Sequence, residues 1–239
     1  MNTIKFNKNS TKIVAHRGLS GIEKENTNAA FVAAGNRSYY GIETDIHRTS
    51  DGRFVVCHDD DLKRVAGVDI AVEPTTLAEL QSIVLFDKDG TKNREDLRVS
   101  VLENYISICK KYEKHCVLEL KSDFTDEEIS QIIEIVKSFD YLENVTFISF
   151  IYSNMTKIRK ICPTQSVQFL FSKFDDEIIE RLIAAHIDVD VYYKVLTKEM
   201  IDLLHENGLK VNCWTVDNPE SAEKLSAWGV DYITSNILE

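Results

Sequence analysis

Two histidines stand out because each directly follows a short apolar run. His16 follows residues 13–15, and His58 follows residues 54–57. Imidazole titrates near neutral pH, so one ring can take up a proton while another donates one. The sequence therefore makes His16 and His58 candidates for acid–base catalysis.

Three acidic residues lie at the ends of other apolar runs. Glu43 and Asp45 alternate within residues 42–46, so they share one face of an expected strand, and Glu119 ends a run that begins at Val117. Carboxylates held close together repel one another unless a cation lies between them. Because ligation by oxygen alone favours a hard ion over zinc, we predict one divalent metal ion, Mg²⁺ or Ca²⁺, bound by these residues.

Two basic residues stand beside these groups. Arg17 could bind phosphoryl oxygens with both arms of its guanidinium, and Lys121 could meet them as a point charge. Lys121 shares a strand face with Glu119, and a plain ion pair within the barrel is the alternative for both basic residues. Trp214 could floor a substrate pocket or simply pack at the barrel rim.

The other histidines are interpreted as structural residues. They are His47, His115, His186 and His205. His47 lies on the face of Glu43 and Asp45 and could border the site, so its role is left open.

The elements that must position these residues alternate between strands and helices. Eight apolar segments are expected to be parallel strands, at Ile13, 42–46, Val117, 145–150, 167–171, 187–191, 210–216 and 231–234. Eight such units in 239 residues predict an α/β fold, a (β/α)₈ TIM barrel, in which functional residues gather at the carboxyl ends of the strands. An open doubly wound sheet is the alternative, but the chain has no glycine-rich dinucleotide loop.

A single domain spanning residues 1–239 is expected, with a small insertion after the second strand at about residues 50–98. A short strand at 54–57 belongs to this insertion. Elsewhere Ser100 with Glu103 and Thr125 with Glu128 have the spacing of helix capping boxes, and Asn218-Pro219 is typical of a helix start.

Composition limits the kinds of binding partner and the cellular compartment that we expect for the protein. The formal net charge of −11 argues against binding to nucleic acid or to an anionic membrane surface. Five cysteines without CxxC pairing favour a reducing, cytoplasmic setting. No signal peptide or membrane span is seen, so no stable membrane insertion is expected. The oligomeric state is left open.

Several of these motifs occur in a characteristic order. They are Ala15-His16-Arg17-Gly18, Glu25-Asn26-Thr27, Ile42-Glu43-Thr44-Asp45, Thr49-Ser50-Asp51-Gly52, His58-Asp59, Glu119-Leu120-Lys121 and Trp214-Thr215-Val216. This series resembles the glycerophosphodiester phosphodiesterase family from Ile13 to the end of the chain. Lys24 stands where the family usually has proline, and residues 60–98 match poorly, so the head-group alcohol is left open.

The resemblance implies metal-dependent hydrolysis of small glycerophosphodiesters to sn-glycerol 3-phosphate and an alcohol. In the mechanism proposed for the family, the glycerol 2-hydroxyl attacks phosphorus and water then opens a cyclic phosphate. The resemblance also implies metal ligation by Glu43, Asp45 and Glu119, proton transfer by His16 and His58, and phosphate binding by Arg17 and Lys121.

Two alternative functions fit the same barrel. A phosphodiesterase of the lysophospholipase D type would need an apolar groove beside the site, lined by residues of the insertion. A non-catalytic barrel that binds a phosphorylated ligand should lack a metal ligand or a histidine, and no such residue is missing here.

Overall fold

Eight parallel strands close into a barrel in the computed structural model, which describes residues 2–239. Around the barrel the strands follow the order β1, β2, β5, β6, β7, β8, β9 and β10, and pairing of β10 with β1 closes it. Their bounds are Lys12–Ala15, Gly41–Arg48, His115–Leu120, Val145–Ser149, Ser166–Phe171, Asp188–Tyr192, Val211–Trp214 and Tyr232–Ser235. The predicted TIM barrel is confirmed, with all eight expected strands.

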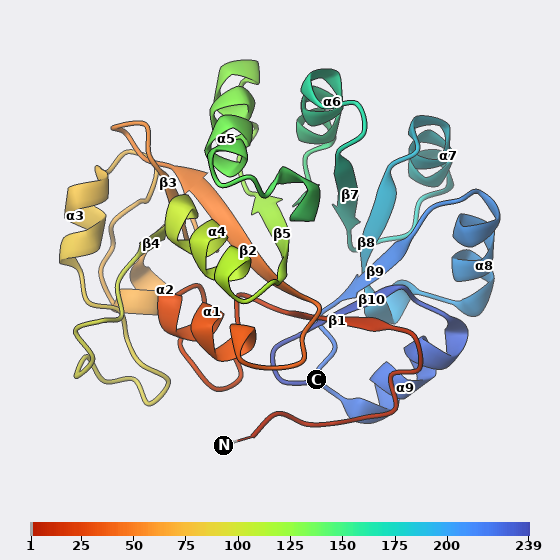
Figure 1. Ribbon diagram of the computed structural model, residues 1–239, viewed down its shortest axis with the longest axis horizontal. Coiled ribbons are helices and arrows are strands. Elements are labelled where there is room, and N and C mark those ends of the chain that lie inside the picture. Colours follow the sequence, from red (N-terminus) through yellow and green to blue (C-terminus); the bar gives the residue numbers. More distant parts are fainter. Residues whose placement is uncertain (1) are drawn as a thin grey trace.

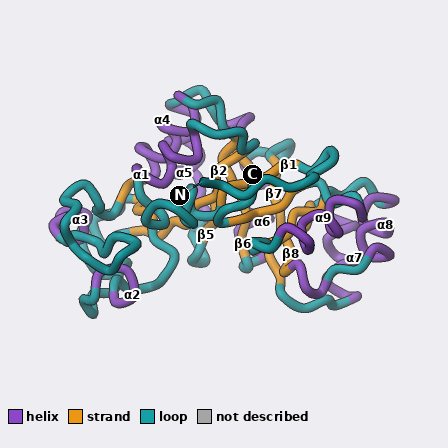
Figure 2. Tube along the Cα trace, turned by 90° about the horizontal axis from the view of Figure 1, so that it is seen from below, coloured by secondary structure: helices purple, strands orange, loops and turns teal. Residues whose placement is uncertain are grey.

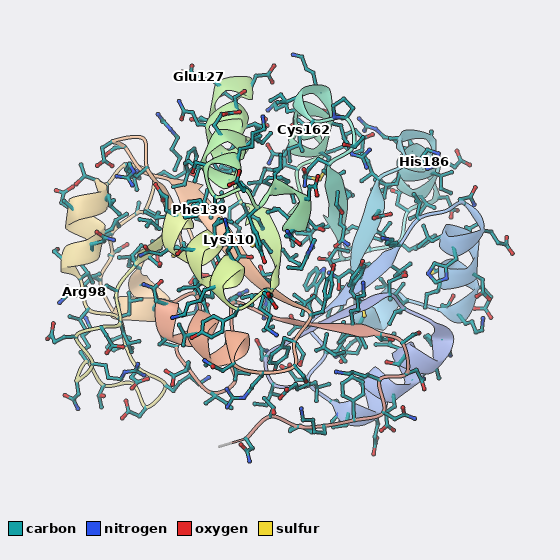
Figure 3. The ribbon with its side chains drawn as sticks, in the orientation of Figure 1. Arg98, Lys110, Glu127, Phe139, Cys162 and His186 are labelled. Carbon is teal, nitrogen blue, oxygen red and sulfur yellow. The ribbon has the colours of Figure 1, made fainter. Side chains whose placement is uncertain are left out.

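Helices surround the strands (Figure 1). They are α1 (Asn28–Gly35), α4 (Leu102–Lys111), α5 (Asp126–Ser138), α6 (Tyr152–Ile161), α7 (Asp176–Ala185), α8 (Lys198–Glu206) and α9 (Pro219–Trp228), with short 3₁₀ turns at Leu142–Asn144 and Tyr193–Val195. Helix α5 buries Ile129, Ile132, Ile133 and Val136, the spacing of one helical face. Lys110 links α4 to the end of α5, because its Nζ donates to the carbonyl oxygen of Phe139, just beyond α5, at 2.5 Å (Figure 3).

The insertion lies at one side of the barrel, at the left in Figures 1 and 2. It contains β3 (Phe54–Val56), α2 (Lys63–Ala66), α3 (Leu77–Ser82) and β4 (Ser100–Val101), and β3 pairs antiparallel with the end of β2. A separate apolar cluster fills it, including Leu62, Leu80 and Leu97. The insertion therefore has a small core of its own and is joined to the barrel through β2.

Helix starts follow the expected capping signals with one exception. Thr125 and Glu128 form the reciprocal capping box, and Asn218 caps α9 ahead of Pro219. The capping box expected at Ser100 and Glu103 is wrong. Ser100 lies in β4, where its hydroxyl donates to Asn28 Oδ1 at 2.6 Å, and Val101 precedes the helix without a side-chain cap. Ser100, which the local pattern assigned to the start of the helix, instead pairs with β3 as part of β4.

The barrel interior combines an apolar cluster with buried polar side chains. Val14, Val117, Ile148 and Leu170 form the cluster, with Trp214 packed against them. Asn212 is also buried and is bonded to Gln168 and Thr234. Over residues 2–239, every helix falls short of the length and hydropathy that a bilayer crossing requires.

Candidate active site

A cavity of about 160 Å³ opens at the carboxyl ends of the barrel strands. Its lining combines charged and polar residues with apolar ones, namely His16, Arg17, Glu43, His58, Glu119, Ile148, Phe150, Leu170, Asp190, Trp214, Thr215 and Thr234. Six of the eight predicted site residues lie in this lining. The other two, Asp45 and Lys121, are not in the lining but pair with residues that are. Asp45 pairs with Arg17, and Lys121 pairs with Glu119.

The turn after β1 brings Arg17 to the cavity. Arg17 and Gly18 both have left-handed backbone conformations, with φ of 55° and 75°. The turn is fixed to β2, because Arg17 N donates to Glu43 Oε2 at 2.7 Å and Gly18 N donates to Glu43 O at 3.2 Å. A Cβ at position 18 would lie 2.7 Å from the backbone carbon of Ala30. Only glycine fits this close approach to α1.

His16 is held through one ring nitrogen. Its Nδ1 lies 2.8 Å from Asn236 Oδ1, while Asn236 Nδ2 donates to Asp217 Oδ2 at 2.6 Å. Because the amide nitrogen faces Asp217, the amide oxygen must face His16, so Nδ1 carries the proton and Nε2 is the basic atom. Burial, followed by the nearby Arg17, lowers the pKa of His16 to about 4.

His58 is held in the same way by a charged partner. Its Nδ1 lies 2.7 Å from Asp59 Oδ1, and Arg64 Nε donates to Asp59 Oδ2 at 2.7 Å. Burial lowers the pKa of His58, although Asp45 and Asp59 oppose this shift. Within residues 2–239 neither Nε2 has a hydrogen-bond partner, so both imidazoles present a free Nε2, which is the arrangement that proton transfer requires.

The three predicted acidic residues meet in one buried cluster. Ligand atoms of Glu43, Asp45 and Glu119 lie within 4.8 Å of one another. The exposed fractions of the three residues are 3%, 1% and 7%. Burial and the neighbouring carboxylates raise the pKa of Glu43 well above its usual value and that of Glu119 to about 8. The three residues therefore resist carrying a negative charge each unless a positive charge lies among them.

Asp45 is the best supported of the three acidic residues. Asn26 Nδ2 donates to its Oδ2 at 2.8 Å, Lys121 Nζ lies 3.5 Å from its Oδ1, and Arg17 Nε lies 3.6 Å from Oδ2. Burial alone would raise the pKa of Asp45, but Lys121 and Arg17 hold it below its usual value. Lys121 also donates to Glu119 Oε1 at 2.9 Å, so the ion pair considered for it is present.

The donor set fits a hard divalent cation. All its atoms are carboxylate oxygens, and the buried Asp45 Oδ1 has no hydrogen-bond partner within residues 2–239. A cation among these oxygens would relieve the repulsion that raises two of the pKa values. The buried acidic triad could therefore bind a metal ion.

Aromatic side chains line the outer part of the cavity. Trp214, at the end of β9, meets Phe150 edge-on with ring centroids 5.7 Å apart. Its Nε1 donates to the backbone oxygen of Asp190 at 3.3 Å. The side chain thus borders the cavity, and a role for it in binding substrate stays a prediction.

The remaining histidines have structural contacts. His115 stacks on Tyr40 and bonds Thr146 at the other end of β5, and His205 bonds Asp231. His186 lies exposed at the end of α7 on the outside of the molecule (Figure 3). His47 is buried beside Glu73 of the insertion and is absent from the cavity lining.

Among the site residues not identified from the sequence, two carry groups that matter for the chemistry. Asn236, which holds His16, follows the last strand and carries no distinctive local pattern. Asp190, which lines the cavity, had a detectable signal, because Asp188 and Asp190 alternate within an apolar strand as Glu43 and Asp45 do.

Comparison with known proteins gives one consistent result. Residues 16–238 match the model of the glycerophosphoryl diester phosphodiesterase family. YhdW of Bacillus subtilis is 30% identical over 234 residues, which cover 94% of this chain and 93% of the relative. A glycerophosphodiester phosphodiesterase of Caldanaerobacter subterraneus is 28% identical over 231 residues, covering 95% and 94%.

Solved structures agree with these relatives. An Oleispira antarctica phosphodiesterase, solved in complex with the product sn-glycerol-3-phosphate, superposes with a TM-score of 0.88 at 25% identity. The similarity covers 98% of this chain and 96% of that one. The barrel and its cavity therefore belong to a known enzyme architecture.

Proposed function

The chain belongs to the glycerophosphoryl diester phosphodiesterase family of phosphoric diester hydrolases, and on that premise we propose that it hydrolyses small glycerophosphodiesters to sn-glycerol 3-phosphate and an alcohol. One observation carries the proposal. Two imidazoles with free Nε2 atoms and a buried acidic triad converge at one cavity of about 160 Å³. That cavity suits a glycerol phosphate group better than a polymer.

Glu43, Asp45 and Glu119 are the proposed metal ligands. A divalent cation held by them would neutralise charge on the phosphoryl oxygens and make a bound hydroxyl more acidic. Mg²⁺ and Ca²⁺ are both candidates, because both bind carboxylate oxygens. Calorimetric titration of the protein with each ion would distinguish them.

Arg17 and Lys121 are the proposed phosphate-binding residues. Arg17 lines the cavity and its guanidinium is already oriented by Glu25, whose Oε1 accepts from Arg17 Nη1 at 2.9 Å. Lys121 is shared between Asp45 and Glu119 and adds positive charge behind the triad. The two cations would meet a diester anion that the acidic cluster alone would repel.

His16 and His58 are the proposed proton carriers. One Nε2 removes a proton from the attacking hydroxyl, and the other protonates the leaving alcohol. In the free protein burial lowers the pKa of both rings, and the negative charge of a bound diester favours protonation of one of them. The reaction thus begins with one ring protonated and one neutral.

Product analysis tests this function. The protein should release sn-glycerol 3-phosphate from glycerophosphocholine or glycerophosphoethanolamine in the presence of Mg²⁺ or Ca²⁺. His16→Ala and His58→Ala should each lower kcat by about 10²- to 10⁴-fold. Release of no product from a panel of such diesters, with either metal, would contradict the proposal.

The apolar rim of the cavity favours a second candidate, a lysophospholipase D-type activity. Phe150 is 47% exposed beside Trp214 and could contact a lipid chain. These residues belong to the barrel rather than to the insertion, where the sequence analysis expected such a groove. Choline release from lysophosphatidylcholine, without release from glycerophosphocholine, would support this candidate. Binding of a phosphorylated ligand without turnover of any diester would instead indicate a sensor.

A further inference from the structure

Asp190 is a buried carboxyl group that the proposed mechanism does not use. It lies on β8, four strands around the barrel from β2, and therefore faces the acidic cluster across the cavity. Only 2% of the residue is exposed, and Oδ1 has no hydrogen-bond partner within residues 2–239. A carboxyl group in this state normally destabilises a fold unless something else binds it.

The polar neighbours of Asp190 are already paired with one another. Asn212, directly across from it on β9, donates to Gln168 at 3.3 Å and accepts from Thr234 at 3.2 Å. Burial, and then the charge of Glu119, raise the pKa of Asp190 well above the usual value, and no cationic side chain in the described part of the chain opposes this shift. The protein thus keeps a polar group at the cavity wall and supplies no partner for its Oδ1 within residues 2–239.

The substrate has one part that could be this partner. A glycerophosphodiester has a constant glycerol end and a leaving alcohol that varies in size. Both Phe150, which is 47% exposed, and Asp190, which is 2% exposed, line the cavity. A leaving alcohol of variable size has room only on the exposed side, by Phe150, which leaves the buried side, by Asp190, for the three-carbon glycerol. The glycerol carries a 2-hydroxyl that reacts and a terminal hydroxyl that does not.

We infer that the Asp190 carboxyl binds the unreacting terminal hydroxyl of the substrate's glycerol and thereby selects diesters in which that hydroxyl is free. This inference rests on the proposed function. A hydroxyl group both donates and accepts hydrogen bonds, so it can pair with a carboxyl group in either protonation state. Diesters acylated at that position would lose the contact, because the ester oxygen has no proton and the acyl group needs more room.

A pair of substrates isolates this contact. Glycerophosphocholine has both hydroxyls, and 2-hydroxypropyl phosphocholine of the same configuration keeps the reacting hydroxyl but lacks the terminal one. The parent protein should prefer glycerophosphocholine in kcat/KM by about 10- to 100-fold, since a site built to bond a hydroxyl rejects an analogue without it. In Asp190→Ala and Asp190→Leu, this ratio should fall to within about threefold of unity.

Asp188→Ala is the matched control. Asp188 lies two residues earlier on the same strand, accepts from Lys210 N at 2.9 Å, and is absent from the cavity lining. Its replacement should leave the substrate ratio of the parent protein unchanged. Asp190→Leu should also have a thermal midpoint at least equal to that of the parent, because it removes an unpaired buried carboxyl group and fills the space.

Two results would overturn the inference while leaving the proposed function intact. One is a parent protein that cleaves both substrates equally well, and the other is an Asp190→Ala variant that keeps the preference of the parent. A parent protein that releases no glycerol 3-phosphate from glycerophosphocholine, by contrast, would contradict the proposed function itself.

Discussion

Each histidine of the cavity is oriented by an oxygen atom on Nδ1, from an amide in one case and from a carboxylate in the other. These partners decide which ring nitrogen is free to react. Residue types alone therefore do not define the site, since the same imidazole with its ring turned over would present the wrong atom.

The hydrogen bond between His16 and Asn236 gives a prediction at the scale of single residues. Asn236→Ala removes the acceptor of Nδ1, so kcat should fall by about 10- to 100-fold with little change in KM, because ring orientation affects reaction more than binding. Steady-state kinetics with glycerophosphocholine would measure both constants. Asn144→Ala, at an exposed position after α5, is the control. An unchanged kcat would show that Asn236 does not orient the ring.

A second prediction concerns metal binding. Glu119→Gln removes one carboxylate ligand and should weaken the affinity for Mg²⁺ or Ca²⁺ by at least about tenfold, with a parallel loss of activity. Calorimetric titration measures the affinity. Glu127→Gln, on the outer face of α5 (Figure 3), changes the net charge equally and should bind metal as the parent does. Equal affinities in the two variants would contradict ligation by the triad.

Most of the site residues could be predicted from the sequence, because they sit at the ends of apolar runs. The runs predict strands, and the closure of a barrel brings their carboxyl ends together. Asn236 could not be predicted, since its role depends on the distance between β1 and β10 in space. Asp190 could have been, from the same alternation of acidic and apolar residues that identified Glu43 and Asp45.

The turn after β1 is the element on which the site depends most. It carries His16 and Arg17, and its backbone reaches both β2 and α1. Sequence analysis recognised the motif, but the reason for its glycine is a close approach to Ala30 that only the folded chain shows. The error at Ser100 has a similar origin, because strand pairing overrode a local capping pattern.

This close approach gives a prediction at the scale of the element. Gly18→Ala should lower the free energy of unfolding by about 2–4 kcal/mol, since it combines a positive φ with a clash against backbone. Gly90→Ala is the matched control. Gly90 has φ of 83°, and within residues 2–239 no atom beyond Gly90 and its two chain neighbours lies within 4 Å of the place that its Cβ would take. Only the cost of the conformation, about 1 kcal/mol, should therefore remain. Chemical denaturation measures both. Equal losses would show that the contact with Ala30 is unimportant.

At the scale of the whole molecule, the candidate catalytic residues lie at the carboxyl end of the barrel, and residues with structural contacts such as His115 lie at the amino end. His115 lies at the amino end of β5, stacked on Tyr40, and burial lowers its pKa to about 4. The insertion supplies His58 and reaches the turn after β1 through Arg64, which pairs with Glu25.

The course of residues 60–98 could not be predicted, because they lack the regular alternation of the barrel. That residues 1–239 form a single domain stays a prediction.

His115 makes folding stability depend on pH. Its pKa in the folded protein lies below the ordinary value of 6.5, so the unfolded chain takes up the proton first as the pH falls. The stability that the neutral ring provides is therefore complete above pH 6.5, falls between pH 6.5 and about pH 4, and is fully lost below about pH 4. The full loss should amount to about 3 kcal/mol.

His115→Gln tests this account, because glutamine can keep the bond to Thr146 without titrating. Denaturation at pH 7 and pH 4.5 should show a smaller loss of stability in the variant than in the parent. His186→Gln, at an exposed position, should behave as the parent does. A parent-like loss in His115→Gln would assign the acid sensitivity to other groups.

The most direct test of the whole account is the release of sn-glycerol 3-phosphate from glycerophosphocholine, followed with and without a divalent ion. We predict release with Mg²⁺ or Ca²⁺, its abolition by a chelator, and its near-complete loss in both His16→Ala and His58→Ala. Full activity in the chelator, or in either histidine variant, would contradict a reaction that depends on the acidic triad and the two imidazoles.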